Sequence, residues 1–302
     1  MESKVGTVIV TYNRLTLLKE AVEALRQQTY LNQQIIIVNN GSTDSTAEWL
    51  QKQKDIVIIN QENLGGAGGF FTGMKYVAEH NFDFCWIMDD DVICQPNALE
   101  ELIYAYYRKK NIGFVCSKVV GTNGNPMNVP TINTYSKDGN YPNFTDLIEF
   151  QMIKVSEATF VSLFLSTKII FEAGLPYKEF FIWGDDTEYT TRISKKYDCY
   201  MACKSIVLHK RLIQKAISFE NETDSGRLKM HYYANRNLGF IGIKHYNKRR
   251  IKIILGFIKC SIKHLLHGHT KQFYIMLQAS KNLISFNPKI KFPQNNKSII
   301  HS

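Results

Sequence analysis

The chain has 302 residues, 44% hydrophobic and 21% charged, so it can bury one large or two modest cores and is not expected to be disordered. Its formal net charge of +10 is uneven, because residues 225–302 hold fifteen of the 37 basic residues and none of the 27 acidic ones. No apolar run approaches the roughly twenty residues of a spanning helix, so none is expected.

The first 120 residues alternate between strand and helix patterns. Apolar, β-branched runs predict strands within residues 5–13, 33–44, 55–61, 83–91 and 112–120. Apolar residues at helical spacing predict helices within residues 14–28, 45–53, 63–80 and 97–109. This order predicts an α/β fold with a mostly parallel central sheet flanked by helices.

Polar residues follow four of the predicted strands. The stretches are TYNR (11–14), NNGSTD (39–44), QENLGG (61–66) and DDD (89–91). Ligands of parallel sheets bind beyond the carboxyl ends of the strands, so we expect these stretches to converge on one site.

The rest of the chain is less regular. Residues 121–143 are rich in Asn, Gly and Pro and predict a surface loop, and residues 157–176 return to strand and helix signals. We expect a catalytic domain at 1–224 and a helical, basic C-terminal region at 225–302.

The three aspartates at 89–91 end a buried strand, where each charge disfavours ionisation of its neighbours. Asp89 and Asp91, two residues apart, could bind a hard divalent cation together, with Asp90 pointing elsewhere. The alternative is an acidic turn that caps the next helix. The glycine cluster at 65–69 could let a ligand approach the backbone or simply pack a helix tightly on the sheet.

A second acidic stretch follows an aromatic segment at 180–183. Asp185, Asp186 and Glu188 could supply a general base beside Trp183, or could favour a helix N-terminus. His209 ends a further strand-like run and could be structural or a third metal ligand.

The order of these motifs over about residues 5–215 resembles glycosyltransferase family 2, the inverting enzymes with a GT-A fold. VTYNR, VNNGSTD, NLGGAGGF, WIMDDDV and WGDDTEY followed by His209 are most similar to the galactofuranosyltransferase branch, and rhamnosyltransferases share part of the pattern.

The resemblance implies roles for particular residues. It implies that Asp89, Asp91 and His209 hold Mn or Mg, and that Asp186 is the catalytic base. The residues implied to contact the nucleotide-sugar donor are Thr11, Tyr12, Asn13, Arg14, Asn40, Asn63, Gly65, Gly66, Asp89 and Asp90. The residues implied to face the acceptor are Trp183, Asp185 and Glu188.

One position departs from the family pattern. Many members have Asp where this chain has Asn40, to pair with the uracil imide. An Asn amide can pair with uracil or thymine, so a UDP-sugar is the first expectation and a dTDP-sugar the second. The expected acceptor is a cell-surface polysaccharide or a lipid-linked glycan.

The basic segment 247–271 predicts an amphipathic helix. Lys248, Lys252, Lys259, Lys263 and His267 fall on one side of it. Such a helix suits an anionic membrane surface, so a cytoplasmic, peripheral position at the inner face of the membrane is expected; packing on the catalytic domain is the alternative. No nucleic-acid-binding motif accompanies the charge, so nucleic acid is not an expected partner.

Three rivals share these features. Another hexosyltransferase, such as one using dTDP-rhamnose, would keep the fold and change the donor. A non-catalytic nucleotide-sugar or glycan-binding protein could do without a catalytic base, whereas Asp186 is present here. A nucleotidyltransferase would have a basic glycine loop near the first strand, where this chain has TYNR.

Overall fold

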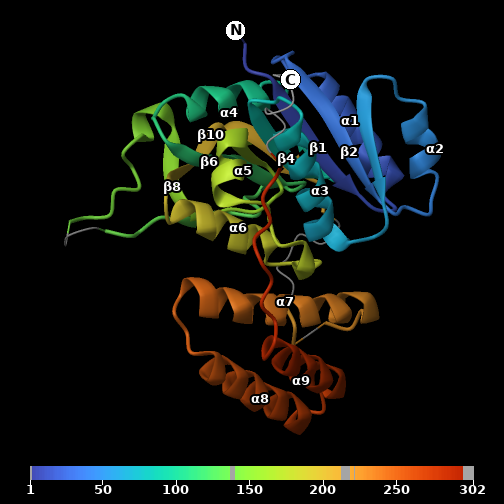
Figure 1. The fold of residues 1–302 in the computed structure, drawn as a ribbon, viewed down its shortest axis with the longest axis vertical. Coiled ribbons are helices and arrows are strands. Elements are labelled where there is room, and N and C mark those ends of the chain that lie inside the picture. Colours follow the sequence, from blue (N-terminus) through green and yellow to red (C-terminus); the bar gives the residue numbers. More distant parts are fainter. Residues whose placement is uncertain (1, 137–139, 212–217, 221, 295–302) are drawn as a thin grey trace, which may run out of the picture.

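The computed structural model describes residues 2–136, 140–211, 218–220 and 222–294. Figure 1 shows two layers: a twisted sheet with helices on both of its faces, and beneath it a group of three helices. The sheet and its helices are built from the first two thirds of the chain, and the three helices from the last third.

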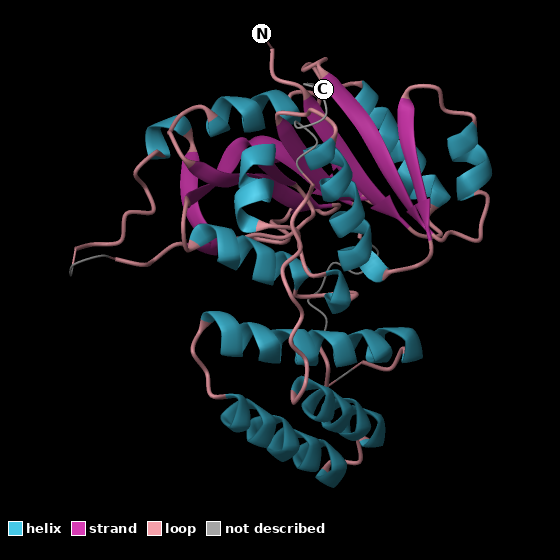
Figure 2. Ribbon diagram, in the orientation of Figure 1, coloured by secondary structure: helices cyan, strands magenta, loops and turns pink. Residues whose placement is uncertain are grey.

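The sheet has strand order β3-β2-β1-β4-β9-β6-β10-β8-β7, with β5 paired to β10. Figure 2 shows its strands in magenta and the surrounding helices in cyan. The strands are β1 Val5–Thr11, β2 Gln33–Asn40, β3 Ile56–Gln61, β4 Phe84–Asp89, β5 Val92–Cys94, β6 Ile112–Gly121, β7 Thr131–Ile132, β8 Met152–Glu157, β9 Leu163–Ser166 and β10 Asp198–His209. The first four predicted strands correspond to β1, β2, β3 and β4. These four strands run parallel to one another.

Beyond β4 the sheet is mixed. Strand β9 lies antiparallel between β4 and β6, and β6 pairs in parallel with β10. The predicted fifth strand, β6, is therefore not the neighbour of β4. The predicted surface loop at 121–143 contains only the short strand β7 within its described part.

Helices cover both faces of the sheet and enclose two apolar cores. They are α1 Leu15–Arg26, α2 Thr46–Gln51, α3 Gly65–Glu79, α4 Ala98–Tyr106, α5 Thr167–Ala173 and α6 Asp185–Ser194, with short 3-10 turns η1 Ile148–Phe150 and η2 Lys178–Phe180. Helix α3 packs closely on β1, since a Cβ on Gly69 or Gly73 would lie 2.2 or 2.3 Å from Val10 or Val8. Tight packing on the sheet, one of the two interpretations of the glycine cluster at 65–69, thus holds for Gly69.

The three C-terminal helices are α7 Ser225–His245, α8 Arg250–Leu266 and α9 Thr270–Leu283. A third apolar cluster joins them to the sheet layer, because Phe240 and Leu283 pack with Tyr177 and Phe180. After α9 the chain runs back along the sheet layer (Figure 1), where the amide of Leu175 donates to the carbonyl of Lys291 at 2.8 Å. Within the described ranges no helix has both the length and the apolarity needed to cross a bilayer.

Candidate active site

Three predicted ligands meet at the carboxyl edge of the sheet. Asp89 ends β4, Asp91 follows it in the turn to β5, and His209 ends β10. Strand β5 pairs antiparallel with β10, which places Val92 opposite His209 and brings Asp91 next to the imidazole. One ligand atom from each of the three side chains lies within 4.8 Å of the others. Such a set of two carboxylates and one imidazole could hold a divalent ion.

The hydrogen bonds of His209 and Asp91 fit a metal. The Nδ1 atom of His209 lies 2.9 Å from Oδ1 of Asn128. An amide oxygen only accepts, so Nδ1 carries the proton and Nε2 presents a lone pair, the form that binds metals. Oδ1 of Asp91 is buried, lies 3.1 Å from that Nε2 and accepts no hydrogen bond from any described residue. Two acceptor atoms that face each other without a proton are suited to share a cation.

Arg14 supplies the positive charge among the three aspartates. Its Nη1 atom donates to Oδ2 of Asp91 at 2.9 Å and to Oδ1 of Asp90 at 3.3 Å. Asp90 also accepts from Oγ1 of Thr11 at 2.8 Å, so its side chain is directed toward the end of β1. Burial lowers the pKa of Arg14, but the three carboxylates outweigh this effect and hold the pKa above its usual value. Thr11, Arg14 and Asp90 therefore shape the carboxylate site.

The pKa values of the aspartates show how crowded the site is. Burial and the neighbouring charge of Asp91 raise the pKa of Asp89 to about 7, and burial raises the pKa of Asp90 to about 6. Burial would raise the pKa of Asp91, but His209 in its protonated, metal-free form and Arg14 outweigh burial and lower this pKa. The positive charge present in the site does not offset all three carboxylates. A divalent cation would provide the missing positive charge.

The loops after β1 and β2 are joined to each other. Asn13 has φ +54°, and its Oδ1 accepts from the amides of Thr43 and Asp44 at 2.7 and 3.3 Å. Tyr12, just before it, is 44% exposed. Together with the Thr11–Asp90 bond and the bonds of Asn40 to Gln61 and Leu64, these contacts bring the four predicted strand ends to one place, so their expected convergence is confirmed.

Asn40 holds the glycine loop through its side-chain amide. Its Oδ1 accepts from Nε2 of Gln61 at 2.7 Å and from the amide of Leu64 at 3.1 Å. Its Nδ2 donates to the carbonyl of Gly65 at 3.0 Å and to Oδ1 of Asn63 at 3.3 Å. Both polar atoms of Asn40 are thus engaged by protein, and its predicted pairing with a base would require breaking these bonds.

The glycine loop contains one constrained position and one open position. Gly65 has φ +71°, and a Cβ there would lie 2.1 Å from the carbonyl oxygen of Phe181, so only glycine fits. A Cβ on Gly66 would meet no atom within 4 Å. Of the two predicted glycines, Gly66 has space beside it for a ligand, and Gly65 allows contact with the aromatic segment at 180–183.

The second acidic stretch begins helix α6. Asp185 is 7% exposed, and burial together with the adjacent Asp186 raises its pKa well above the usual range. The charge of Asp89 adds to this increase, so the two acidic motifs act on each other. Asp186 is half-buried, its Oδ1 accepts from the amide of Thr187 at 2.7 Å, and burial raises its pKa as well. Trp183, half-buried with φ +60°, packs edge-on against His231 at 5.1 Å between ring centroids.

Glu188 does not face an acceptor, and that prediction is wrong. Its side chain has no exposed surface. Oε2 accepts from Nη2 of Arg192 at 2.8 Å, and Oε1 lies 2.9 Å from Nε2 of His245 on α7. Glu188 therefore links α6 to α7 inside the protein.

Three residues of the site region were not predicted. Asn128, in the loop after β6, orients His209. On α7, Nδ2 of Asn237 contacts the carbonyls of Phe180, Ile182 and Trp183 at 3.0, 3.2 and 2.8 Å, and Arg236 donates to the carbonyl of Glu179 at 2.7 Å. An asparagine in a loop, or an asparagine or arginine in a helix, forms no distinctive pattern, so the sequence offered no signal for these three residues.

Comparisons with known proteins agree with this architecture. Galactofuranosyltransferase GlfT1 of Mycobacterium tuberculosis is 36% identical over 123 residues, which are 39% of this chain and 40% of that protein. Glycosyltransferase GlyG of Streptococcus pneumoniae is 32% identical over 119 residues, 38% of each protein. An uncharacterized glycosyltransferase of Bacillus subtilis, YwdF, is 35% identical over 101 residues, 33% of this chain and 37% of that protein.

The matched segments span about two fifths of each of these relatives. Residues 7–167, just over half of the chain, match the sequence profile described as Glycosyl transferase family 2. That match includes Asp89 and Asp91 and ends before Asp186 and His209. The chain belongs to glycosyl transferase family 2.

Proposed function

We propose that this protein is a metal-dependent, inverting glycosyltransferase that transfers galactofuranose from UDP-galactofuranose to a cell-surface polysaccharide or lipid-linked glycan. Asp89, Asp91 and His209 support the donor site, because they present two carboxylates and a correctly protonated imidazole at the carboxyl edge of the sheet. The buried Oδ1 of Asp91, which accepts no hydrogen bond from any described residue, is the observation that carries the proposal.

The same three residues would hold Mn or Mg. When bound, the ion offsets negative charge that develops on the departing nucleotide diphosphate. Arg14 places a further positive charge on the same carboxylates and is half-exposed, so it is available to the diphosphate.

Asp186 is the proposed base. It takes the proton from the acceptor hydroxyl while the hydroxyl oxygen bonds to the anomeric carbon and the bond from that carbon to UDP breaks. This single displacement inverts the anomeric centre. Burial raises the pKa of Asp186, which makes its carboxylate a better proton acceptor than an ordinary aspartate. Trp183 and Asp185 precede it on the same segment and are proposed to face the acceptor.

The choice of sugar follows the relatives, one of which is named a galactofuranosyltransferase. UDP is proposed as the nucleotide. Because Asn40 is engaged by Gln61 and Leu64, base recognition is assigned instead to the residues after β1, including the exposed Tyr12. A lipid-linked acceptor would place the protein at the inner face of the cell membrane, in keeping with its basic C-terminal region.

The test is titration calorimetry with UDP and dTDP, each with and without Mn, followed by turnover of UDP-galactofuranose. We expect Mn-dependent binding of UDP and weaker binding of dTDP. Asp186→Asn should reduce transfer by about 100-fold or more and leave UDP binding nearly unchanged. Asp185→Asn is the matched control and should retain more transfer.

Each part of the proposal can fail separately. A preference for dTDP would replace the donor with dTDP-rhamnose or a related sugar. UDP binding without any transfer would indicate a nucleotide-sugar-binding protein, and the absence of binding to either nucleotide by the folded protein would reject the donor site.

A further inference from the structure

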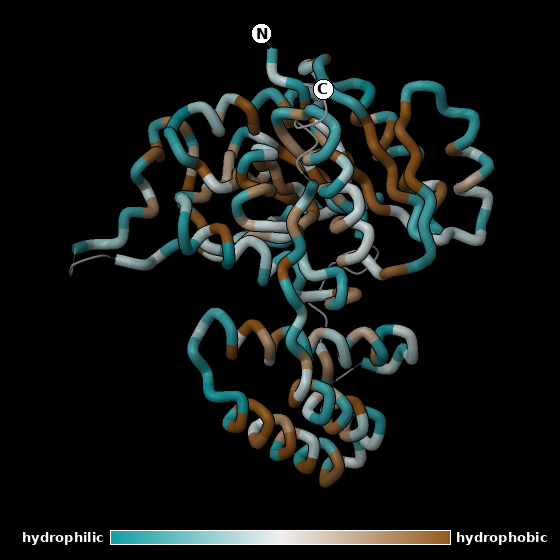
Figure 3. The backbone as a smooth tube through the Cα atoms, in the orientation of Figure 1, coloured by the Kyte–Doolittle hydropathy of each residue, from teal (hydrophilic) through white to brown (hydrophobic). Residues whose placement is uncertain are grey.

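Helix α8 exposes a continuous apolar stripe. Its large aliphatic residues recur at steps of three, four and seven along one side of the helix and point away from the protein. The stripe consists of Ile251 (60% exposed), Leu255 (57%), Ile258 (36%), Ile262 (51%), Leu265 (47%) and Leu266 (80%). Figure 1 places α8 at the end of the molecule farthest from the sheet, and Figure 3 shows apolar segments recurring along it.

This stripe is not the face by which α8 folds against its neighbours. Ser261 and His264 are buried on the opposite side of the helix, where Ile253 and Phe257 are half-buried in the third apolar cluster. Arg250 also points inward, since its Nη1 donates to the carbonyls of Leu283 and Ile284 at 3.0 and 2.6 Å. An amphipathic helix that buries one face and exposes a second apolar face marks an interaction surface.

Positive charge borders the stripe on one side. Lys252, Lys259 and Lys263 are exposed and occupy the next helical positions around α8. At its N-terminal end the charge continues into a pocket of about 430 Å³ lined by Asn247, Lys248, Arg249, Lys252 and Ile253. Three of the described lining residues are cations and none is acidic.

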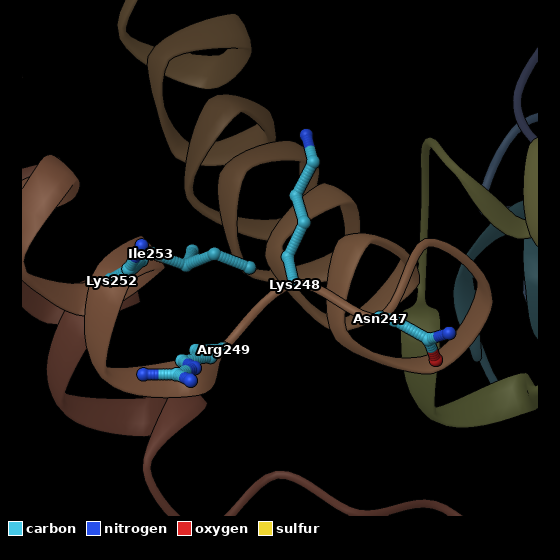
Figure 4. A pocket seen from close by; sticks show the side chains of 5 residues that line it. All are labelled: Asn247, Lys248, Arg249, Lys252 and Ile253. Carbon is cyan, nitrogen blue, oxygen red and sulfur yellow. The ribbon is translucent and has the colours of Figure 1, made fainter.

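Figure 4 shows that Lys248 and Arg249 leave the connection between α7 and α8 in different directions. The charge is therefore spread over the walls of the pocket and does not converge on one point. This arrangement suits several phosphate-bearing headgroups at a surface better than a single enclosed anion.

We propose that the apolar stripe and basic border of α8 bind an anionic lipid bilayer, with the helix in the plane of the interface. The aliphatic side chains enter the acyl boundary, and Lys248, Arg249 and the border lysines contact lipid phosphates. A second copy of this chain has no acidic surface on α8 to complement the basic border, and an antiparallel pair of stripes would bring the two borders together. The inference deepens the proposed membrane association and is independent of the transfer reaction.

The test is co-sedimentation of the full chain with vesicles of phosphatidylcholine, alone or mixed with phosphatidylglycerol. We expect binding to the anionic vesicles only, and release in about 1 M salt, where screening leaves a Debye length of ~3 Å. Replacing Lys252, Lys259 and Lys263 by Ala should lower the partition coefficient by about 100-fold. Replacing the exposed lysines 52, 54 and 110 by Ala, which removes equal charge elsewhere, should change it little.

A second pair of variants tests the stripe. Leu255→Ser with Ile262→Ser should lower binding by at least about 10-fold, whereas Leu31→Ser with Leu238→Ser, two exposed aliphatic side chains outside α8, should not. Equal binding to neutral vesicles, or an unchanged stripe variant, would overturn the proposal. So would self-association without lipid that the stripe variant abolishes. UDP binding with Mn, measured on every variant, separates a failure at this surface from a failure of the proposed function.

Discussion

His209 and Asp91 can share a cation only if the imidazole keeps one orientation and one tautomer. Asn128 fixes both, since its Oδ1 accepts from Nδ1 at 2.9 Å. The residue lies in a loop and has φ +47°, so the backbone is also shaped to place this side chain. Residues that orient a ligand in this way commonly matter nearly as much as the ligand itself.

We therefore predict that Asn128→Ala weakens Mn binding by about 10- to 100-fold although all three ligands remain. His209→Ala should weaken it further. Competition with a Mn indicator measures both changes, and Asn125→Ala, in the exposed part of the same loop, is the control. Unchanged Mn affinity in Asn128→Ala would show that the imidazole is oriented by other contacts.

Glu188 leads to a prediction about stability and pH. Burial raises its pKa, but His245 and Arg192 outweigh burial, so the pKa is lowered in the folded protein. A lowered pKa means that the carboxylate stabilises the fold above the unfolded pKa of about 4.5, and that this contribution is lost as the pH falls through the lowered value.

Glu188→Gln should thus reduce the free energy of unfolding by about 3 kcal/mol at neutral pH, because it leaves the buried guanidinium of Arg192 without its anionic partner. The difference from the unaltered protein should shrink as the pH falls below about 4.5. Urea denaturation at several pH values measures it. As a control, Glu20→Gln, which removes a half-exposed partner of Lys210, should lower the free energy of unfolding by no more than about 1 kcal/mol. A loss of stability in Glu188→Gln that does not change with pH would contradict a stabilising role of the ionised carboxylate.

At the scale of elements, α7 holds the segment that leads into the second acidic motif. Phe181 and Trp183 have φ +64° and +60°, conformations that cost about 1–3 kcal/mol each and need support from their surroundings. Asn237 on α7 has no exposed surface and gives that support through three carbonyls. The position of Asp186 therefore depends on a helix outside the sheet layer.

Asn237→Ala should lower kcat/KM by about 10- to 100-fold, since small displacements of reacting groups have effects of this size. UDP affinity should change much less, because the residues after β1 and β4 are not held by α7. Asn235→Ala is a matched control on the same helix, where the side chain donates to the carbonyl of His231 within α7 itself. Equal losses of UDP binding and transfer would indicate general unfolding of the site.

The sequence predicted the strands themselves better than it predicted which strands lie side by side in the sheet. Strands β1, β2 and β4 were predictable because burial on both faces requires unbroken apolar runs such as those ending at Thr11, Asn40 and Asp89. Strand order was not, because periodicity says nothing about the insertion of β9 between β4 and β6.

The same contrast applies to the site. Asp89, Asp91 and His209 were predictable because metal chemistry demands those residue types, and the structure brings them within reach of one ion. Glu188 was misassigned although its i,i+4 spacing from Arg192 is a recognisable ion-pair signal. Asn128 and Asn237 act from a loop and a helix distant along the chain, and an asparagine there has no distinguishing pattern.

At the scale of the whole molecule, the C-terminal region is not a detachable tail. The predicted boundary at residue 225 falls at the start of α7, and α7 contributes Phe240 and Asn237 to contacts with the sheet layer. The segment after α9 then returns to the sheet layer. There Ile290 lies over Gly174, and the carbonyl of Lys291 accepts from the amide of Leu175. Deleting residues 248–302 would remove this segment together with α8, so point substitutions in α8 give the cleaner test of membrane binding.

The same contacts predict that the two layers unfold together. Ile290 is half-buried against the third apolar cluster, so Ile290→Ala should lower the free energy of unfolding by about 2 kcal/mol. Ile284→Ala, at a position that is 60% exposed, should change it by no more than about 0.5 kcal/mol. Circular dichroism and tryptophan fluorescence should report one shared transition, because Trp49 and Trp86 lie in the sheet layer, Trp183 packs against α7, and α7, α8 and α9 contribute much of the helical signal. Two separated transitions, with Ile290→Ala moving only one of them, would show instead that the helical layer folds independently of the site it contacts.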